Sequence, residues 1–450
     1  MSALYHASIY DTALPVPSYW QASAGAWNAS RFAPLEGDIE AEVAIIGGGY
    51  TGLSAAYHLA RDHGVLACVL DAGPIGFGAS GRNGGFCCLG SAKLSHARMV
   101  ARFGLEETSR FIAAQVEAVE LVRALGAAEG IAFDAQGSGT ITVAHRPSRW
   151  AELEAEAAIL SRHGGGATSL WSRAELRAHG YASSEAFGAL HQAVGFGLHP
   201  LKYARGLADA AHGRGARIHA DSPVIGWQRE AGRHVLATPR GRVRAGRVIV
   251  ATNGFTRDTL HPTLAGTLMP ALSNILVTRP LSAAEIEAQG YSTETPVSDT
   301  RHLLYYVRLL PDRRFMFGAR GGLDASPGAL PRQRAWMERR LGQIYPAWRG
   351  VETKHFWRGL VCLSAALTPH IAALNDERTS FCALAYHGSG VAMASWSGRA
   401  VAALSVGAKG AAEALPAVIA TPPRRYRVPA LRLMRLRLAY AGFRLEDEVL

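Results

Sequence analysis

A glycine-rich turn near residue 50 constrains the fold of this chain more than any other feature. The β-branched run 42–47 predicts a short buried strand, and 51–61 predicts a helix with apolar residues on one face. A second apolar strand, 65–71, follows and ends at Asp71. The turn between the first strand and the helix has the pattern Gly-x-Gly-x-x-Gly, formed by Gly47, Gly49 and Gly52. This order of strand, turn, helix and strand is typical of a βαβ unit that binds a dinucleotide.

The glycines of this turn have distinct physical roles in such a unit. Gly47 allows the tight turn, Gly49 lets the backbone approach a pyrophosphate, and Gly52 permits close packing of the helix on the strand. The helix N-terminus offers free N–H groups and its positive dipole end to the phosphates. Asp71 can accept hydrogen bonds from a ribose hydroxyl, and its charge argues against a 2′-phosphate. The alternative is a glycine-rich turn that binds nothing.

Two further glycine-rich segments extend this pattern. Residues 78–85 read Gly-Ala-Ser-Gly-Arg-Asn-Gly-Gly and lie just past the second strand. Residues 387–390 read His-Gly-Ser-Gly and precede a predicted helix of small residues, 391–403. A helix that begins there would direct N–H groups and a positive dipole end at a bound cofactor and so favour its reduction.

These motifs resemble those of the D-amino-acid oxidase (DAO) superfamily of FAD-dependent oxidoreductases, and within it the γ-glutamylputrescine oxidoreductases. The resemblance implies FAD held without a covalent bond. It also implies an α/β fold in which a Rossmann-like FAD-binding domain interleaves with an α+β substrate domain, as in p-hydroxybenzoate hydroxylase. The segments that carry the resemblance cover most of the chain: 44–57, 78–85, 198–203, 251–254, 357–359, 387–390 and 440–450.

A chain of 450 residues is too long for one compact core, and it contains no low-complexity linker. We therefore expect domains that interleave along the sequence. The expected parts are an N-terminal arm (1–39), an FAD-binding domain (40–98, 190–262 and 355–412), a substrate domain (99–189 and 263–354) and a C-terminal tail (413–450).

The resemblance also implies which residues contact FAD. The phosphate turn and Asp71 would bind the pyrophosphate and the ribose, and the second glycine-rich loop would run along the flavin. The expected cofactor-binding residues are Gly47, Gly49, Tyr50, Thr51, Gly52, Asp71, Ala72, Gly78, Ala79, Ser80, Arg82, Asn83, Gly84, Gly85, Val224, Thr252, Asn253, Gly254, Gly388, Ser389, Gly390 and Val391.

The reaction implied by the resemblance is oxidation of a C–N bond. A hydride from the carbon next to a neutral amine passes to the flavin, and water hydrolyses the resulting imine. Adjacent Tyr305 and Tyr306 point to opposite faces of a strand, so at most one of them faces the flavin. His387 is either catalytic or a packed, hydrogen-bonded histidine. The candidate catalytic residues are His387, Ser389, Tyr305 and Arg308, with Tyr306 and Trp357 as further pocket walls.

Several alternatives remain open at this point. The chain could be a non-catalytic dinucleotide-binding subunit or an NAD-linked dehydrogenase, although the two later glycine-rich segments favour flavin. The substrate could be a γ-glutamylated polyamine or a secondary amino acid. The electron acceptor is open too, because Met316 takes the position where some relatives carry a lysine over the flavin. Oxygen activation would then depend on Arg308, Arg314 or Arg320.

Composition narrows the possible partners and the compartment. The formal charge is +11, but the arginines are scattered and no nucleic-acid module is present, so we expect no nucleic-acid partner. The five cysteines lack CxxC spacing and no HxH or HExxH pair occurs, so we expect no metal and a cytoplasmic location. The arginine-rich tail segment 424–437 is expected to pack on the body, with a membrane-surface helix as the alternative.

Overall fold

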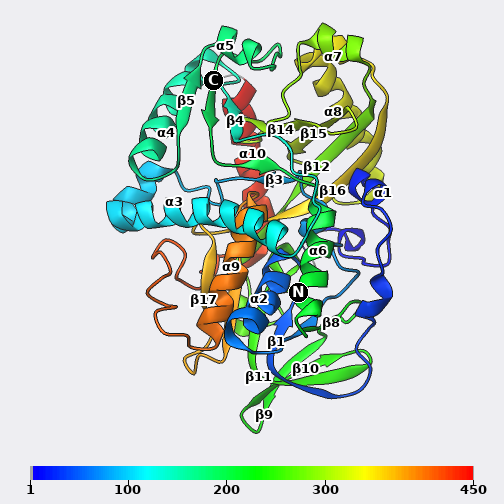
Figure 1. Ribbon diagram of the computed structural model, residues 1–450, viewed down its shortest axis with the longest axis vertical. Coiled ribbons are helices and arrows are strands. Elements are labelled where there is room, and N and C mark those ends of the chain that lie inside the picture. The colour runs from blue at the N-terminus through cyan, green and yellow to red at the C-terminus, as the bar shows by residue number, and fades with distance from the viewer. Residues whose placement is uncertain (1–3, 449–450) are drawn as a thin grey trace.

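Two large mixed sheets, one above the other in Figure 1, organise the chain, and helices cover their outer faces. The computed structural model describes residues 4–448. Each sheet takes its strands from well-separated parts of the sequence. This arrangement confirms the predicted α/β fold with two interleaved parts.

The lower sheet in Figure 1 contains the dinucleotide-binding unit at its centre. Its main strand order is β17-β18-β11-β1-β2-β8, with β10 and then β9 attached to β11. The neighbours of β1 on both sides, β11 and β2, run parallel to it. The strands are β1 (Ile39–Ile46), β2 (Cys68–Leu70), β8 (Arg217–His219), β9 (Gly226–Glu230), β10 (Arg233–Thr238), β11 (Gly241–Val250), β17 (His370–Ala373) and β18 (Ser380–Leu384).

Small side chains let the helices of this lower part pack closely. Ala55 and Ala56 are fully buried in α2, and a Cβ atom on Gly398 of α9 would lie 2.5 Å from the carbonyl oxygen of Thr51. Helix α2 therefore lies directly against α9, and α6 contacts its other side. The helices of this layer are α2 (Tyr50–His63), α3 (His96–Ala128), α6 (Pro200–Gly213) and α9 (Gly390–Ser405).

The upper sheet has the strand order β16-β12-β15-β14-β13-β4-β6-β5. Most of its neighbouring strands are antiparallel, and only β13 and β4 pair in parallel. Its strands are β4 (Thr140–Val143), β5 (Thr168–Trp171), β6 (Ala189–Gln192), β12 (Leu268–Pro280), β13 (Val297–Asp299), β14 (Tyr305–Leu309), β15 (Arg314–Arg320) and β16 (Thr353–Ser364). The helices around it are α4 (Trp150–Arg162), α5 (Arg173–Ala178), α7 (Ala283–Gln289) and α8 (Leu330–Ile344).

The exact domain bounds stay a prediction, but several of them fall inside structural elements. The bound at residue 99 falls in α3, the bound at 190 in β6 and the bound at 355 in β16. Strand β16 pairs with β12 along most of its length and so belongs to the upper sheet. Hydrophobic periodicity alone does not assign this strand to one of the two sheets, because a buried strand has the same sequence pattern in either sheet.

The N-terminal arm is fastened to the glycine-rich loop 78–85. Trp20, in the short helix α1 (Tyr19–Ser23), is 2% exposed, and its Nε1–H donates to the carbonyl oxygen of Asn83 at 2.8 Å. A two-stranded ribbon, β3 (Phe86–Cys87) and β7 (Phe196–Gly197), continues from the same loop. The arm therefore supports the loop from outside.

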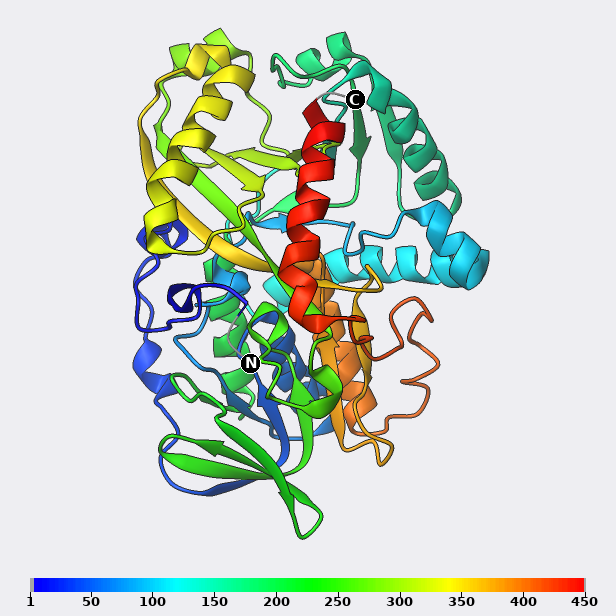
Figure 2. The same cartoon turned by 180° about the vertical axis from the view of Figure 1, so that it is seen from behind.

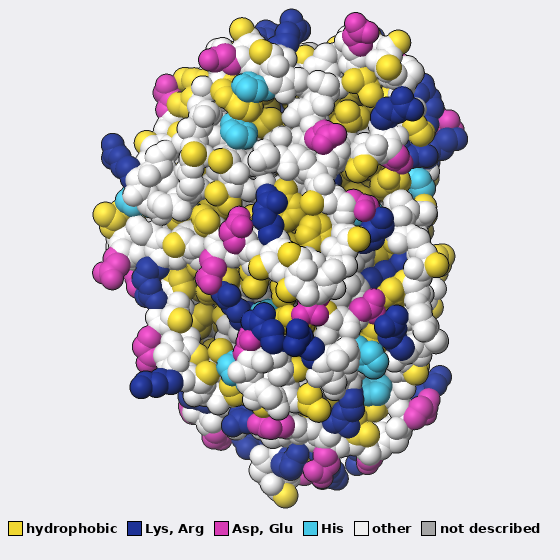
Figure 3. Space-filling model, in the orientation of Figure 1, with side chains coloured by type: hydrophobic (Ala, Val, Ile, Leu, Met, Phe, Trp, Pro, Cys, Tyr) yellow, Lys and Arg dark blue, Asp and Glu magenta, His cyan; other side chains and the backbone are white. Residues whose placement is uncertain are grey.

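The C-terminal helix α10 (Arg432–Glu448) lies on the outer face and runs alongside both parts, as Figure 2 shows. Basic and acidic side chains are interspersed on the opposite face in Figure 3. Within residues 4–448, no helix is both long and apolar enough to cross a bilayer. The same residues contain no cluster of three or more His, Cys, Asp or Glu side chains suited to a metal ion.

Candidate active site

A cavity of about 600 Å³ lies between the two sheets. Asp71 and Val224 line one end of it, beside the phosphate turn. Tyr306 and Arg320, from the upper sheet, line the other end. The cavity is therefore shaped for an elongated group that starts at the βαβ unit and ends beneath the upper sheet.

The phosphate turn has the geometry that its glycines require. Gly47 has φ = 109°, and a Cβ atom there would lie 2.8 Å from the carbonyl oxygen of Ala251. A Cβ atom on Gly52 would collide with the carbonyl oxygen of Gly47. The Asp71 carboxylate accepts from the N–H of Gly48 at 2.6 Å and from that of Gly73 at 3.0 Å. Asp71 thus also holds the turn, a role the motif did not predict.

Two helix N-termini line the cavity, and neither is capped by the side chain of its own N-cap residue. Helix α2 begins after Gly49 and α9 after Ser389, and neither residue makes a side-chain capping hydrogen bond. Free N–H groups and the positive end of the helix dipole suit a pyrophosphate at α2 and a reduced flavin ring at α9. The residues present therefore fit FAD.

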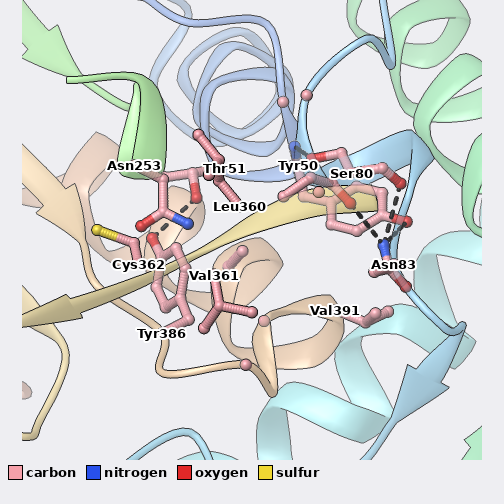
Figure 4. Close-up of a pocket in the computed structure, with 18 of the residues that line it drawn as sticks. Tyr50, Thr51, Ser80, Asn83, Asn253, Leu360, Val361, Cys362, Tyr386 and Val391 are labelled. Atoms are coloured by element: carbon pink, nitrogen blue, oxygen red, sulfur yellow. Dashed lines mark hydrogen bonds between the residues drawn. The ribbon is translucent and has the colours of Figure 1, made fainter. Parts of the chain in front are cut away.

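The second glycine-rich loop is held in shape by its own side chains (Figure 4). Asn83 Nδ2–H donates to the carbonyl oxygens of Ala79 and Ser80, and Asn83 Oδ1 accepts from the N–H of Gly85 at 2.7 Å. Ser80 Oγ accepts from the N–H of Tyr50 at 3.0 Å and so joins this loop to the start of α2. These bonds order the loop along the cavity wall, so it is not a solvated turn.

Nearly all the expected cofactor-binding residues line the cavity. The two exceptions are Gly52, which packs inside the βαβ unit, and Gly85, which faces away toward Leu198. Asn253 Oδ1 accepts from the N–H of Ala385 at 2.9 Å and so ties the loop after β11 to that after β18. Segments far apart in the sequence are thereby brought together at the cavity.

Arg308 lies behind the cavity, not in it. Its guanidinium donates to the carbonyl oxygens of Leu198, Gly84 and Gly85 at 2.7, 3.2 and 3.3 Å, and it is 1% exposed. Burial lowers the pKa of Arg308 to about 10. The structure therefore corrects the expectation that Arg308 is catalytic, and makes it a support of the glycine-rich loop.

The two adjacent tyrosines point to opposite faces of β14, as the alternation of a strand predicts. Tyr306 lines the cavity, and its hydroxyl lies 2.9 Å from Ser273 Oγ. Tyr305 stacks on Phe317 in the core of the upper part, and its hydroxyl accepts from Arg340 Nε. Tyr305 is therefore corrected as a catalytic candidate, and Tyr306 takes its place at the cavity wall. Trp357 also lies behind the wall.

The ring of His387 is held in place by a hydrogen bond to the backbone. Its Nε2 lies 3.1 Å from the carbonyl oxygen of Thr368, so Nε2 carries the proton and Nδ1 does not. Nδ1 is buried without a partner among residues 4–448. Burial lowers the pKa of His387 to about 3, so the ring stays neutral near pH 7. These contacts favour the packed histidine over the catalytic one, although both His387 and Ser389 line the cavity.

Two basic side chains meet at the substrate end of the cavity. Arg320, the last residue of β15, donates to the carbonyl oxygen of His387 at 2.8 Å and lines the cavity. Lys93, from the loop before α3, also lines it, and burial and the neighbouring Arg320 lower its pKa well below the usual lysine value. The motif analysis missed Lys93, although it is one of only four lysines and lies eight residues after the glycine-rich loop.

The acidic groups of the cavity are already engaged, so these two basic side chains lack a carboxylate partner within residues 4–448. Glu156 pairs with His96, and Asp299 pairs with Arg301. Of the three arginines considered for oxygen activation, only Arg320 lines the cavity. Arg314 pairs with Asp312, and Met316 is fully buried.

Fold and site together define an FAD-dependent oxidoreductase. The sequence matches the DAO family, "FAD dependent oxidoreductase", over residues 42–404. The chain belongs to the DAO family, and its reaction is FAD-dependent oxidation of the C–N bond of an amine or amino acid. The family and the reaction class predicted from the sequence are thereby confirmed, and neither alternative function is supported.

Relatives of the chain agree with this assignment. It is 31% identical over 438 residues to a gamma-glutamylputrescine oxidoreductase of Escherichia coli (strain K12), covering 94% of this chain and 96% of the relative. It is 32% identical over 380 residues to a "Probable oxidoreductase OrdL" of Rhizobium meliloti (strain 1021), covering 84% and 85%.

Solved structures share the fold. Glycine oxidase from Geobacillus kaustophilus has a TM-score of 0.66 at 21% identity, covering 82% of this chain and 95% of that protein. L-Amino acid deaminase from Proteus vulgaris has a TM-score of 0.69 at 16% identity, covering 88% and 99%.

We predict that FAD is bound without a covalent link. Cys362 lines the cavity, but burial raises the pKa of its thiol far above the usual cysteine value, so it is not a nucleophilic thiolate. Acid precipitation of the holoprotein should leave the yellow colour in the supernatant. Colour that stays with the wild-type pellet and leaves the Cys362→Ser pellet would show a tether at this residue.

Proposed function

We propose that the protein oxidises an amine that carries a carboxylate, such as a γ-glutamylated diamine. The observation that supports this substrate class is the pair of basic side chains at the substrate end, Lys93 and Arg320, neither of which has a carboxylate partner in the described chain. An anionic group on the substrate would compensate the charge of Arg320 and favour the protonated form of Lys93. The relative named gamma-glutamylputrescine oxidoreductase acts on a compound of this chemistry.

The protein's own groups orient this substrate. When bound, FAD accepts the hydride from the carbon next to the amine. Arg320 and Lys93 would hold the carboxylate, which fixes the distance of the amine from that anchor. Tyr306 supplies an aromatic wall, and its hydroxyl is engaged with Ser273. The N-terminus of α9 offers N–H groups where negative charge develops on reduction.

We predict that Arg320→Met raises the KM for γ-glutamylputrescine about 100-fold, which corresponds to roughly 2.7 kcal/mol for a charge-assisted contact. The KM for putrescine, which lacks the carboxylate, should change less than about threefold. Steady-state kinetics with both amines measure this difference. Because Arg320 also bonds to His387, Arg320→Lys serves as the variant that keeps the charge.

An equal rise in KM for the two amines would assign Arg320 a structural role and overturn the proposed anchor. Lys93→Met provides a second test, since no side-chain hydrogen bond of Lys93 exists among the described residues.

The lowered pKa of Lys93 also gives the sign of a pH effect on substrate binding. Carboxylate binding by Lys93 is complete below that pKa and is lost as the pH rises through it.

We also propose a cytoplasmic location. All five cysteines are free, and four of them are buried: Cys68, Cys87, Cys362 and Cys382. A reducing compartment suits such thiols. Fractionation of cells with a tagged chain tests this location, and recovery of the tagged chain outside the cytoplasmic membrane would contradict it.

A further inference from the structure

The C-terminal helix α10 is fastened to the body by its inner face. Arg432 pairs with Asp258 at 2.5 Å and donates to the carbonyl oxygen of Leu268 at 2.7 Å. Leu436 and Tyr440 are buried in an apolar cluster beneath the helix. Asp447, near the other end, accepts from the N–H groups of residues 302 and 303. The helix therefore keeps one orientation, and its outer face is fixed relative to the body.

The outer face carries a row of exposed apolar side chains, which we call the outer stripe: Leu431, Met434, Leu438 and Leu445, which are 40, 48, 66 and 54% exposed. At about 100° per residue, the three of them that belong to α10 fall within an arc of roughly 40°. The four residues extend from the residue before α10 to its last turn, on the side opposite the buried Leu436 and Tyr440. Nothing in the described chain covers this stripe.

Positive charge flanks the outer stripe on both sides. On the helical projection, Arg435 lies along one edge, and Arg437 and Arg444 lie along the other. These three arginines are exposed, and none makes an ion pair within residues 4–448. No acidic residue occurs between positions 424 and 445. The acids that follow are engaged, since Glu446 pairs with His302 and Glu448 with Arg301.

We propose that the outer stripe and its arginines hold the protein on an anionic lipid bilayer, with α10 lying in the plane of the surface. Exposed leucines flanked by arginines match the composition of helices that lie at the boundary between headgroups and acyl chains. Each arginine near such a surface adds attraction to anionic lipids. A second copy of the chain fits less well, because a symmetric contact through this face would bring arginine against arginine.

Co-sedimentation of the FAD-loaded protein with lipid vesicles tests this surface. The protein should pellet with vesicles of phosphatidylcholine and phosphatidylglycerol, but not with phosphatidylcholine alone, and added salt should weaken the binding. Arg435→Glu with Arg437→Glu should weaken it at least about tenfold. The matched control, Arg162→Glu with Arg339→Glu, changes the charge equally at exposed sites elsewhere and should bind normally.

The apolar part of the surface is tested separately. Met434→Ser with Leu438→Ser should reduce vesicle binding, whereas Leu66→Ser with Leu105→Ser, at residues that are each 53% exposed, should not. Retained FAD absorbance and amine oxidation show that each variant is folded. The proposal is overturned if the protein stays in the supernatant with anionic vesicles, or if the stripe variant and its control bind alike. A dimer in sedimentation velocity that only the stripe variant dissociates would assign the stripe to a second copy instead.

Discussion

Gly49→Val should yield a folded protein that binds FAD at least about 100-fold more weakly, a loss of roughly 2.7 kcal/mol. A Cβ atom at this position would lie 2.9 Å from Ser80 Oγ, and a branched side chain would also extend into the space where the backbone approaches the pyrophosphate. Titration of the apoprotein with FAD, followed by flavin fluorescence, measures the change in affinity.

The matched control for this substitution is Gly213→Val, because a Cβ atom on Gly213 meets nothing within 4 Å. Gly213 is the last residue of α6 and does not line the cavity. This variant should bind FAD as the wild type does. A Gly49→Val protein that purifies folded with full flavin occupancy would mean that the phosphate turn has been misassigned.

Arg308→Leu should lower the free energy of unfolding by about 4 kcal/mol, because it leaves buried carbonyl oxygens without donors. Those carbonyls belong to Gly84, Gly85 and Leu198, so the loop along the cavity should also lose its order. Denaturant unfolding of the apoprotein measures the stability, and FAD titration measures the second effect. Arg339→Leu, at an exposed site of α8, should change neither quantity by more than about 0.5 kcal/mol.

A small loss of stability in Arg308→Leu with normal FAD binding would contradict the supporting role. Conversely, a variant of normal stability and FAD content that no longer oxidises amines would restore Arg308 as a catalytic candidate. A supporting role therefore predicts a change in stability and FAD binding, whereas a catalytic role predicts a change in amine oxidation alone.

The sequence predicted the dinucleotide-binding unit well because its determinants are local. The run 42–47, the glycine pattern and the helix 51–61 each specify their own backbone, and β1 and α2 are found there. The alternation of Tyr305 and Tyr306 was predictable as well. Which of the two faces the cavity was not, because the packing of β14 against the core of the upper part decides it.

The substrate end could not be predicted from local patterns. Lys93 lies in a loop before α3 and Arg320 ends β15, and only the tertiary fold brings them to one cavity. From the sequence, Arg308 was as good a candidate for the cavity as Arg320. In the structure, three backbone carbonyl oxygens bind Arg308 behind the glycine-rich loop. Long-range contacts of this kind leave no periodic signal in the sequence.

Anaerobic reduction of the bound flavin tests the central claim most directly. The FAD-loaded protein is mixed with γ-glutamylputrescine in a stopped-flow instrument without oxygen, and the yellow absorbance band is followed. The predicted result is rapid bleaching, with an aldehyde formed in equal amount after the imine is hydrolysed. Putrescine should bleach the flavin more slowly at the same concentration. If FAD stays bound and oxidised against a full panel of amines and amino acids, the protein is not an amine-oxidising flavoenzyme.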